Sequence, residues 1–288
     1  MEPASKFFYS HRLKLQFWDW GPDGAASKKP VLILVHGSRD HARSWDWVAP
    51  ALAKDYHVYA IDLRGHGNSE WGRGAAYTIP EHILDLATFT DIIDAYPVRI
   101  VSHSLGAIVS LYYTGAYPDH VNRLVTIEGV GVGPLGKPPS PAQERMRKWI
   151  AQVRDAENRT SRAYPTLGDA VHRMQEANPF LSAEMAEHLT LHGTNWNAHG
   201  QLVWKFDHYT RIIDPFGLDL QGAQQILSQI TCPTLLFWGK QSFARDPEID
   251  PQAAAIPNKK IVKVDHAGHW LHHDQLELFL KETKEFLR

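Results

Sequence analysis

The sequence predicts an α/β fold in which a mostly parallel sheet is flanked by helices. Six short apolar runs, rich in β-branched residues, do not alternate with polar residues, which is typical of strands buried on both faces. Helical patterns separate these runs, and such alternation of strand and helix is the signature of this fold class. The expected strands are residues 31–35, 57–61, 98–102, 123–127, 234–238 and 260–264.

The elements around these strands can be assigned in chain order. Residues 7–20, FFYSHRLKLQFWDW, alternate well enough for a pair of antiparallel strands ahead of the first parallel one. Apolar residues at helical spacing then predict four helices between and after the parallel strands. These helices are expected at residues 44–54, 81–93, 105–117 and 276–287.

The regular alternation breaks over about a hundred residues before Thr234. This segment is polar, helical in pattern and punctuated by prolines, with Ser140 and Ser182 as expected helix N-caps. Residues 195–217 are rich in aromatic side chains and fit no single pattern. The simplest organisation is a core of residues 1–130 and 231–288, interrupted by a helical cap at residues 131–230.

Composition excludes several classes of function. The 288 residues are 43% apolar and 22% charged, with a net charge of −2, so no bulk field favours nucleic acid or an anionic membrane. The longest apolar strand-like run, VLILV, is too short to span a bilayer. The single cysteine, Cys232, cannot form an internal disulfide and is expected to be a buried core residue. We therefore expect a cytoplasmic protein, either a monomer or a homodimer.

A serine lies at the junction between a predicted strand and a predicted helix, in the sequence VSHSLGA. A side chain on such a sharp turn is held exposed, provided that small residues two positions away let strand and helix approach closely. Ser102 and Gly106 meet this need, which makes the pattern Ser-x-Ser-x-Gly rather than Gly-x-Ser-x-Gly. Ser104 is thus a candidate nucleophile, with an ordinary helix cap as the alternative.

A nucleophilic serine needs a general base and donors for an oxyanion. His269 follows the last predicted strand and a glycine that permits a bend, so it is the candidate base. The backbone N–H groups of Leu105, after the nucleophile, and Ser38, after the first parallel strand, are the expected oxyanion donors. Nearby His272 and His273 are adjacent and diverge on a helix, and no cysteine joins them, so we expect no metal site.

Several of these motifs together resemble the α/β-hydrolase superfamily across nearly the whole chain. The matching pieces, in the order and spacing of that superfamily, are HGS (36–38), DLRGHGNS (62–69), SHSLGA (102–107), PTLLFWG (233–239) and AGHWLHHD (267–274). The resemblance implies an eight-stranded, mostly parallel sheet with a helical cap inserted after the sixth strand. It also implies the chain order serine, acid, histidine for a catalytic triad.

The acid that should orient His269 is not at its commonest position in that superfamily. After the seventh strand, where an aspartate is usual, this chain has Ser242, which cannot supply a negative charge. Glu128 ends the sixth strand beside the strand that carries Ser104, as in relatives such as the zearalenone lactonases, and is the preferred candidate. Asp246 is the alternative acid, and the absence of any functional acid is the third possibility.

The leading hypothesis is a cofactor-independent serine hydrolase that cleaves small-molecule carboxylic esters or lactones through an acyl-enzyme. Carbon–carbon bond hydrolysis of dienoic ketones and a non-catalytic small-ligand receptor are the alternatives on the same fold. Aromatic side chains of the cap, among them Trp149, Trp204 and Phe206, are expected to bind the substrate. Each of them could instead belong to the core of the cap itself.

Overall fold

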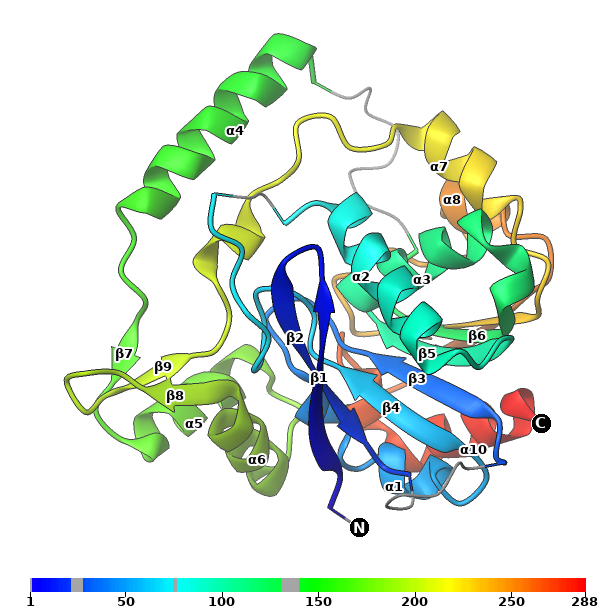
Figure 1. Ribbon diagram of the computed structural model, residues 1–288, viewed down its shortest axis with the longest axis horizontal. Coiled ribbons are helices and arrows are strands. Elements are labelled where there is room, and N and C mark those ends of the chain that lie inside the picture. Colours follow the sequence, from blue (N-terminus) through cyan, green and yellow to red (C-terminus); the bar gives the residue numbers. More distant parts are fainter. Residues whose placement is uncertain (1, 22–27, 75–76, 131–139) are drawn as a thin grey trace.

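A central eight-stranded sheet organises the protein (Figure 1). The computed structural model describes residues 2–21, 28–74, 77–130 and 140–288. The strand order is β1-β2-β4-β3-β5-β6-β10-β11; β2 pairs antiparallel with β1 and β4, and the other neighbours are parallel. The predicted α/β-hydrolase fold is confirmed. The strands are β1 (Ala4–Ser10), β2 (Leu13–Asp19), β3 (Val31–Val35), β4 (His57–Ile61), β5 (Val98–His103), β6 (Val121–Ile127), β10 (Thr234–Gly239) and β11 (Lys259–Val264).

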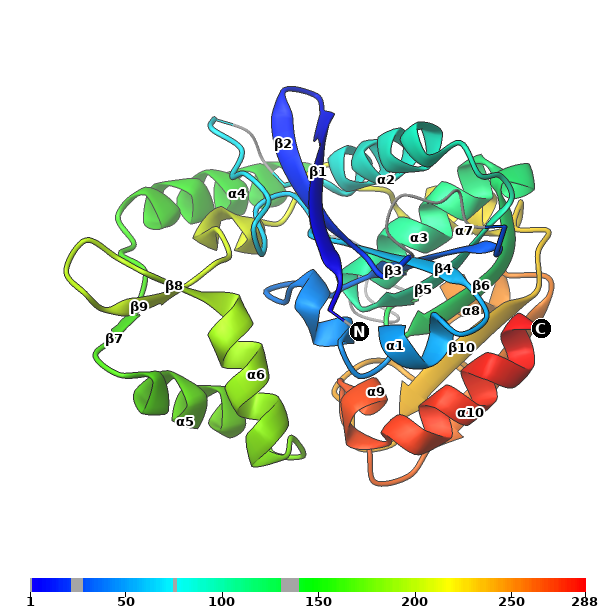
Figure 2. The ribbon, with the colours of Figure 1, turned by 60° about the horizontal axis from the view of Figure 1, so that its bottom comes forward.

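Helices cover both faces of this sheet (Figure 2). One face carries α2 (Ile79–Ile93), α3 (Leu105–Ala116), α7 (Leu220–Leu227) and α8 (Pro251–Ala254), with the short η2 (Pro118–His120) after α3. The other carries η1 (Ala42–Trp45), α1 (Ala49–Leu52), α9 (Leu271–Asp274) and α10 (Leu276–Leu287).

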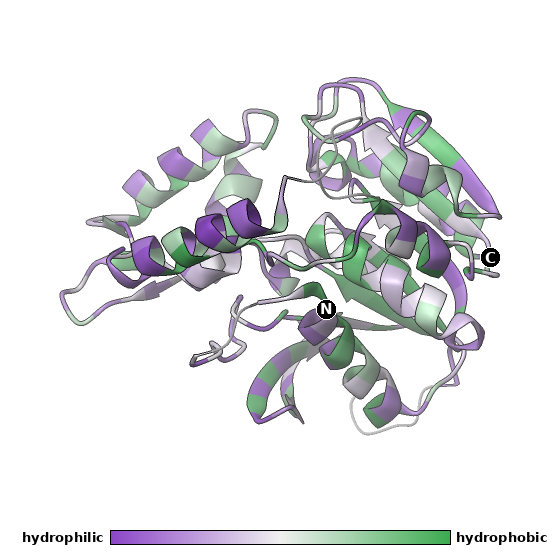
Figure 3. Cartoon of the chain, turned by 90° about the horizontal axis from the view of Figure 1, so that it is seen from above, coloured by the Kyte–Doolittle hydropathy of each residue, from purple (hydrophilic) through white to green (hydrophobic). Residues whose placement is uncertain are grey.

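Two separate hydrophobic clusters form the core, one on each face of the sheet. Consecutive residues of β10 show the division: Leu236 belongs to the cluster with Phe89 and Val109, whereas Phe237 packs against Phe279 on the opposite face. Successive side chains of a strand point to opposite faces, so a strand covered on both faces is apolar throughout. This explains the unalternating runs, and Figure 3 shows the hydrophobic residues gathered in the sheet and the helices packed on it.

One predicted helix is shorter than expected. In place of a continuous helix over residues 44–54, the chain forms η1, a turn and then α1, which has Pro50 in its first turn. Proline has no backbone N–H and cannot donate the hydrogen bond that a helix interior requires, but it fits the first turn of a helix, where that N–H has no partner within the helix. The proline therefore divides the expected helix into two pieces.

Apart from α7, which packs on the sheet, the segment between β6 and β10 lies to one side of the sheet and contains strands as well as helices (Figure 1). Ser182 caps its helix as expected, whereas the N-cap of the first helix is Pro141 rather than Ser140. Three short antiparallel strands in the order β7-β9-β8 were not foreseen. The elements are α4 (Ala142–Glu157), β7 (Ala163–Tyr164), α5 (Leu167–Ala177), α6 (Ala183–Gly193), β8 (Thr194–Trp196), β9 (Leu202–Trp204) and η3 (His208–Arg211).

A polar hairpin turn creates two of these strands. Asn197 accepts hydrogen bonds from the backbone N–H groups of His199 and Gln201, and Gly200 adopts a positive φ of 69°. An Asn that bonds to its own turn and a Gly in the left-handed region are the usual means of reversing a chain. The β-branched and aromatic residues on either side then pair as β8 and β9.

Two expectations drawn from composition can be compared with this fold. Within the described residues, every helix is too short or too polar to cross a membrane. Cys232 is buried, as predicted, and burial raises the pKa of its thiol to about 11. It therefore acts as a core residue rather than as a reactive thiol.

Candidate active site

Ser104 lies on a strained turn between β5 and α3. Its backbone dihedrals, φ of 51° and ψ of −112°, fall outside the conformations that residues other than glycine normally adopt. Its backbone N–H donates to the carbonyl of Ile127 on β6, with an N–O distance of 2.8 Å, which fixes the turn against the neighbouring strand. The strain therefore keeps the Ser104 side chain at the carboxyl edge of the sheet.

Close packing around this turn explains the small residues beside Ser104. A Cβ at Gly106 would lie 2.5 Å from the carbonyl oxygens of Val35 and His36, so only glycine fits there. On the other side, the larger Ser102 is tolerated because its buried hydroxyl hydrogen-bonds the carbonyl of Val125 at 3.3 Å. Serine therefore fits at a position where glycine is usual, because β6 supplies an acceptor for its hydroxyl.

The side chains of Ser104, His269 and Glu128 form a continuous chain of hydrogen bonds. His269 Nε2 lies 2.9 Å from Ser104 Oγ, and His269 Nδ1 lies 3.0 Å from Glu128 Oε2. His269 comes from the loop between β11 and α9, so the three groups meet although they are far apart in sequence. This is the geometry in which an imidazole can accept a hydroxyl proton while a carboxylate orients it.

Glu128 is a fully buried carboxylate whose oxygens are both hydrogen-bonded. Its side chain has no exposed area; Oε1 accepts from the backbone N–H of Gly239 at 2.6 Å, and Oε2 accepts from the hydroxyl of Ser242. Ser242 in turn accepts from the N–H of Ala244 at 3.0 Å, which directs its own proton toward Glu128. A buried charge needs such partners to offset its loss of water.

The backbone at Glu128 is also specialised. Its φ is 50°, and its N–H donates to the carbonyl of Phe237 at 3.1 Å. At Gly129 a Cβ would lie 2.3 Å from the carbonyl oxygen of Ser104. The Glu-Gly pair therefore lets the end of β6 turn directly against the Ser104 turn, and this brings the carboxylate to the histidine.

Asp246, the alternative acid, is engaged elsewhere. Its carboxylate accepts from Lys263 Nζ at 2.7 Å and from the backbone N–H of Glu248 at 2.9 Å. Slight desolvation would raise the pKa of Asp246, but these bonds outweigh it and lower the pKa. Glu128, not Asp246, therefore faces His269, and Ser242 donates to the same carboxylate oxygen of Glu128. Sequence reasoning missed the Ser242 contact because it depends on the shape of one loop.

The loop after β3 passes directly against the serine turn. A Cβ on Gly37 would lie 3.1 Å from Cβ of Ser104, and buried His36 holds the loop through Gly37 O at 2.7 Å and Leu63 N at 3.0 Å. Within the described part of the chain, the N–H groups of Ser38 and Leu105 donate no hydrogen bond. Unpaired backbone donors beside a nucleophile are available to a developing oxyanion.

A cavity of about 440 Å³ opens between the sheet edge and the β6–β10 segment. Ser38 and Trp270, the neighbour of His269, line it, although Ser104 itself does not. Trp204 and Phe206 also line the cavity, whereas Trp149 on α4 is not among its lining residues. The cavity therefore adjoins the serine and histidine and extends away from them under the inserted segment.

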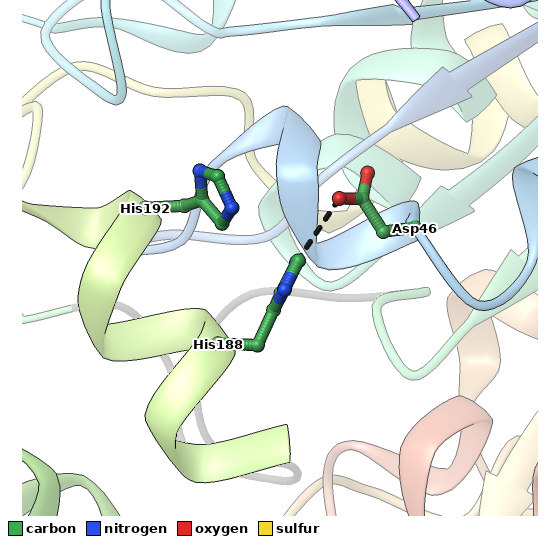
Figure 4. Close-up of side chains that lie close together, drawn as sticks. All are labelled: Asp46, His188 and His192. Atoms are coloured by element: carbon green, nitrogen blue, oxygen red, sulfur yellow. Dashed lines mark ion pairs between the residues drawn. The ribbon is translucent and has the colours of Figure 1, made fainter. Parts of the chain in front are cut away.

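A second polar cluster links this segment to the core (Figure 4). Ligand atoms of Asp46, His188 and His192 lie within 4.8 Å of one another, but the guanidinium of Arg43 already lies 2.6 Å from Asp46 Oδ2. Burial would raise the pKa of Asp46, yet hydrogen bonds from His188 and Arg43 outweigh it and lower the pKa. The positive charge of Arg43 beside Asp46 opposes a metal cation at this cluster. His188 Nε2 lies 3.0 Å from Asp46 Oδ2, so the cluster links η1 to α6.

A mostly parallel sheet with a serine on the strained turn after β5 and a histidine after β11 defines a hydrolase of the α/β class. The chain belongs to the alpha/beta hydrolase family, whose model matches residues 32–282.

Similar proteins cover most of the chain. An uncharacterized protein of Mycobacterium tuberculosis is 34% identical over 283 residues, covering 91% of this chain and 76% of that protein. A serine hydrolase-like protein of Dictyostelium discoideum is 24% identical over 286 residues, covering 93% and 77%. The thioesterase domain from the curacin biosynthetic pathway has the same fold, with a TM-score of 0.85, 22% identity and coverage of 99% and 100%.

Proposed function

We propose that this chain is a cofactor-independent serine hydrolase that cleaves carboxylic esters or lactones. The observation that carries the proposal is the pair of contacts made by His269, with Ser104 Oγ on one nitrogen at 2.9 Å and Glu128 Oε2 on the other at 3.0 Å. Nucleophile, base and orienting acid are thereby in the order that acyl transfer requires. The name of the Dictyostelium relative, a serine hydrolase-like protein, agrees with this reaction class.

The first half-reaction forms an acyl-enzyme. Ser104 Oγ attacks the substrate carbonyl carbon as His269 Nε2 takes the hydroxyl proton, and the charge of Glu128 stabilises the imidazolium that results. The N–H groups of Ser38 and Leu105 bind the negative oxygen of the tetrahedral intermediate. Collapse of this intermediate breaks the bond to the leaving alcohol, which receives the proton from His269.

The second half-reaction releases the acid. Water attacks the acyl carbon while His269 accepts one of its protons, and the second tetrahedral intermediate again places its charge on the two amides. When it collapses, Ser104 recovers its proton from His269 and the carboxylic acid leaves. For a lactone the alcohol and the acid remain in one molecule.

Labelling with a fluorophosphonate and stopped-flow hydrolysis of 4-nitrophenyl acetate test the proposal. We expect the native chain to be labelled on Ser104 and to show turnover, and Ser104→Ala to lose both. Ser110→Ala is the matched control, because Ser110 lies buried in α3 and is expected to leave labelling unchanged. A folded native chain that shows neither labelling nor turnover would contradict the proposal and favour a ligand receptor. Turnover of dienoic ketones in preference to esters and lactones would instead assign carbon–carbon bond hydrolysis.

A further inference from the structure

The cavity beside the candidate active site has an unusual charge. Five arginines contribute to its lining, whereas Asp40 is the one carboxyl group among the described lining residues. The chain as a whole has a net charge of −2, so this concentration of positive charge is a local property of the cavity. The arginines are Arg39, Arg159, Arg162, Arg173 and Arg211.

Three of these guanidinium groups have no carboxylate partner within the described residues. Arg159 pairs with Asp155 and Arg173 pairs with Glu176. Arg39, Arg162 and Arg211, in contrast, make no ion pair there, and the guanidinium of Arg162 lies 5.2 Å from the ring centroid of Tyr164. All three residues are exposed, so their N–H donors, which normally bind carboxylates or phosphates, are open to an anionic ligand in the cavity.

Two of these cations share the cavity although they come from distant parts of the chain. Arg39 lies in the loop after β3 and Arg211 ends η3, and burial and the nearby charge of Arg211 lower the pKa of Arg39. Asp40 compensates little, because burial raises the pKa of its carboxyl to about 7. An anion placed among these groups would relieve their repulsion.

Part of the remaining lining is apolar, and two lining residues adjoin the candidate catalytic groups. Leu189, Trp204 and Phe206 form part of the wall. Trp270 directly follows His269, and Ser38 directly follows Gly37, which packs against Ser104. A ligand that fills about 440 Å³ can therefore extend from the reacting carbonyl past apolar side chains to the arginines.

We propose that the substrate is an ester or thioester that carries a second anionic group, a carboxylate or a phosphate, which binds to Arg39, Arg162 and Arg211 in this cavity. This inference rests on the proposed function and assigns its substrate class. The anion can belong either to the acyl part or to the alcohol or thiol part of the substrate, because both would be recognised by the same guanidinium chemistry.

Two matched pairs of substrates test the proposal and separate these sources. The first compares mono-4-nitrophenyl glutarate, with an anionic acyl group, with neutral 4-nitrophenyl valerate. The second compares S-acetyl-4′-phosphopantetheine, with an anionic thiol part, with neutral S-acetylpantetheine. We expect kcat/KM to favour the anionic member of at least one pair by about tenfold or more, and this advantage to shrink as salt is raised from about 50 mM to 500 mM.

Arginine variants show whether the preference comes from the cavity. Arg39→Gln, Arg162→Gln and Arg211→Gln should each lower kcat/KM for the preferred anionic substrate about three- to tenfold, through KM rather than kcat, and leave the neutral partner unchanged. Arg147→Gln is the matched control, because Arg147 is exposed on α4 and does not line the cavity. Equal rates for both members of both pairs, or equal losses on anionic and neutral substrates, would overturn the proposal.

Binding measurements keep this inference separate from the proposed reaction. In Ser104→Ala, titration with glutarate and with 4′-phosphopantetheine followed by calorimetry should show saturable binding of one of them that is weakened by Arg39→Gln. Binding without any turnover in the native chain would refute the hydrolase and retain the anion site. Turnover of neutral esters with no anion binding would retain the hydrolase and refute the anion site.

Discussion

Ser242 donates the hydrogen bond of its hydroxyl to Glu128 Oε2, the same oxygen that faces Nδ1 of His269. Ser242 occupies the position at which this superfamily usually has its acid. Its hydroxyl is bonded to Glu128, at the end of the neighbouring strand β6. Position 242 thus contributes a donor to the carboxylate rather than the charge itself.

Replacement of Glu128 by Gln should reduce kcat by about four orders of magnitude, as loss of the acid does in the best-studied triad. The amide would present a donor to Nδ1 and favour the wrong tautomer of His269, while its size is unchanged. Steady-state hydrolysis of 4-nitrophenyl acetate measures the loss. Asp246→Asn is the matched control and should retain most activity, since Asp246 pairs with Lys263. The reverse ranking would show that Asp246 is the acid.

Replacement of Ser242 by Ala should lower kcat by about ten- to a hundredfold. The change removes a hydrogen bond to a charged group, worth about 1.5–3 kcal/mol, while the contact between Glu128 and His269 remains. Ser242→Thr keeps the hydroxyl and should recover most of the rate. If Ala and Thr variants were equally impaired, the loss would come from packing of the loop and not from the hydroxyl.

Proline at position 38 should slow hydrolysis strongly, whereas alanine should not. The proposed oxyanion donor is the backbone N–H of Ser38, which Ser38→Pro removes and Ser38→Ala retains. Loss of one such donor costs about 10²–10³ in kcat. Both variants need a melting temperature close to that of the native chain for the comparison to count. Equal activity of the two would place the second donor elsewhere.

Acid should destabilise this protein well above the pH at which its carboxylates lose their charge. Burial lowers the pKa of eight histidines, to about 3 for His41 and His273 and about 4 for His66 and His192. Below about pH 6.5 the unfolded chain binds protons that the folded chain cannot, so the free energy of unfolding falls as pH falls. The other four are His36, His82, His103 and His272.

Three buried carboxyl groups have the opposite effect on how stability changes with pH, but the buried histidines outnumber them. Burial raises the pKa of Asp40 to about 7 and of Asp62 and Asp274 to about 6, so their contribution to stability declines as pH rises from about 4 toward these values. We therefore expect the urea midpoint to fall steadily between pH 7 and pH 5.

A single histidine variant tests this account. His272 packs against Trp45 with ring centroids 4.8 Å apart, and among the residues that the structure describes neither of its ring nitrogens has a hydrogen-bond partner. His272→Phe should therefore reduce the pH dependence by about one proton, whereas exposed His199→Gln should leave it unchanged. A urea midpoint that does not vary between pH 7 and pH 5 would contradict the prediction.

The sequence predicted the sheet and the positions of Ser104 and His269 because each depends on local pattern. Strands buried on both faces are apolar throughout, and a serine turn needs small neighbours. Glu128 required one further step, the adjacency of β5 and β6, which follows from the fold class. The roles of Ser104, His269 and Glu128 in catalysis remain predictions.

Other features depend on tertiary contacts that sequence spacing does not reveal. The hydroxyl of Ser242 reaches Glu128 only because the loop after β10 folds back, and Arg39 and Arg211 line one cavity only because the inserted segment lies over the β3 loop. The hairpin of β8 and β9 was missed because its strands have three residues each, too few for a periodic pattern.

The glycine-rich loop at residues 62–70 takes no part in the proposed chemistry, yet it is hydrogen-bonded to two segments that border the cavity. Asp62 accepts from the N–H of Ala42, beyond the β3 loop, and the carbonyl of Gly65 accepts from the N–H of Asp207 at the start of η3. A Cβ on Gly65 would lie 2.4 Å from the ring of Tyr77, whose hydroxyl donates to Asp207 at 2.6 Å. A side chain introduced at Gly65 would therefore displace Tyr77 and the start of η3, and through them the cavity wall to which Arg211 belongs.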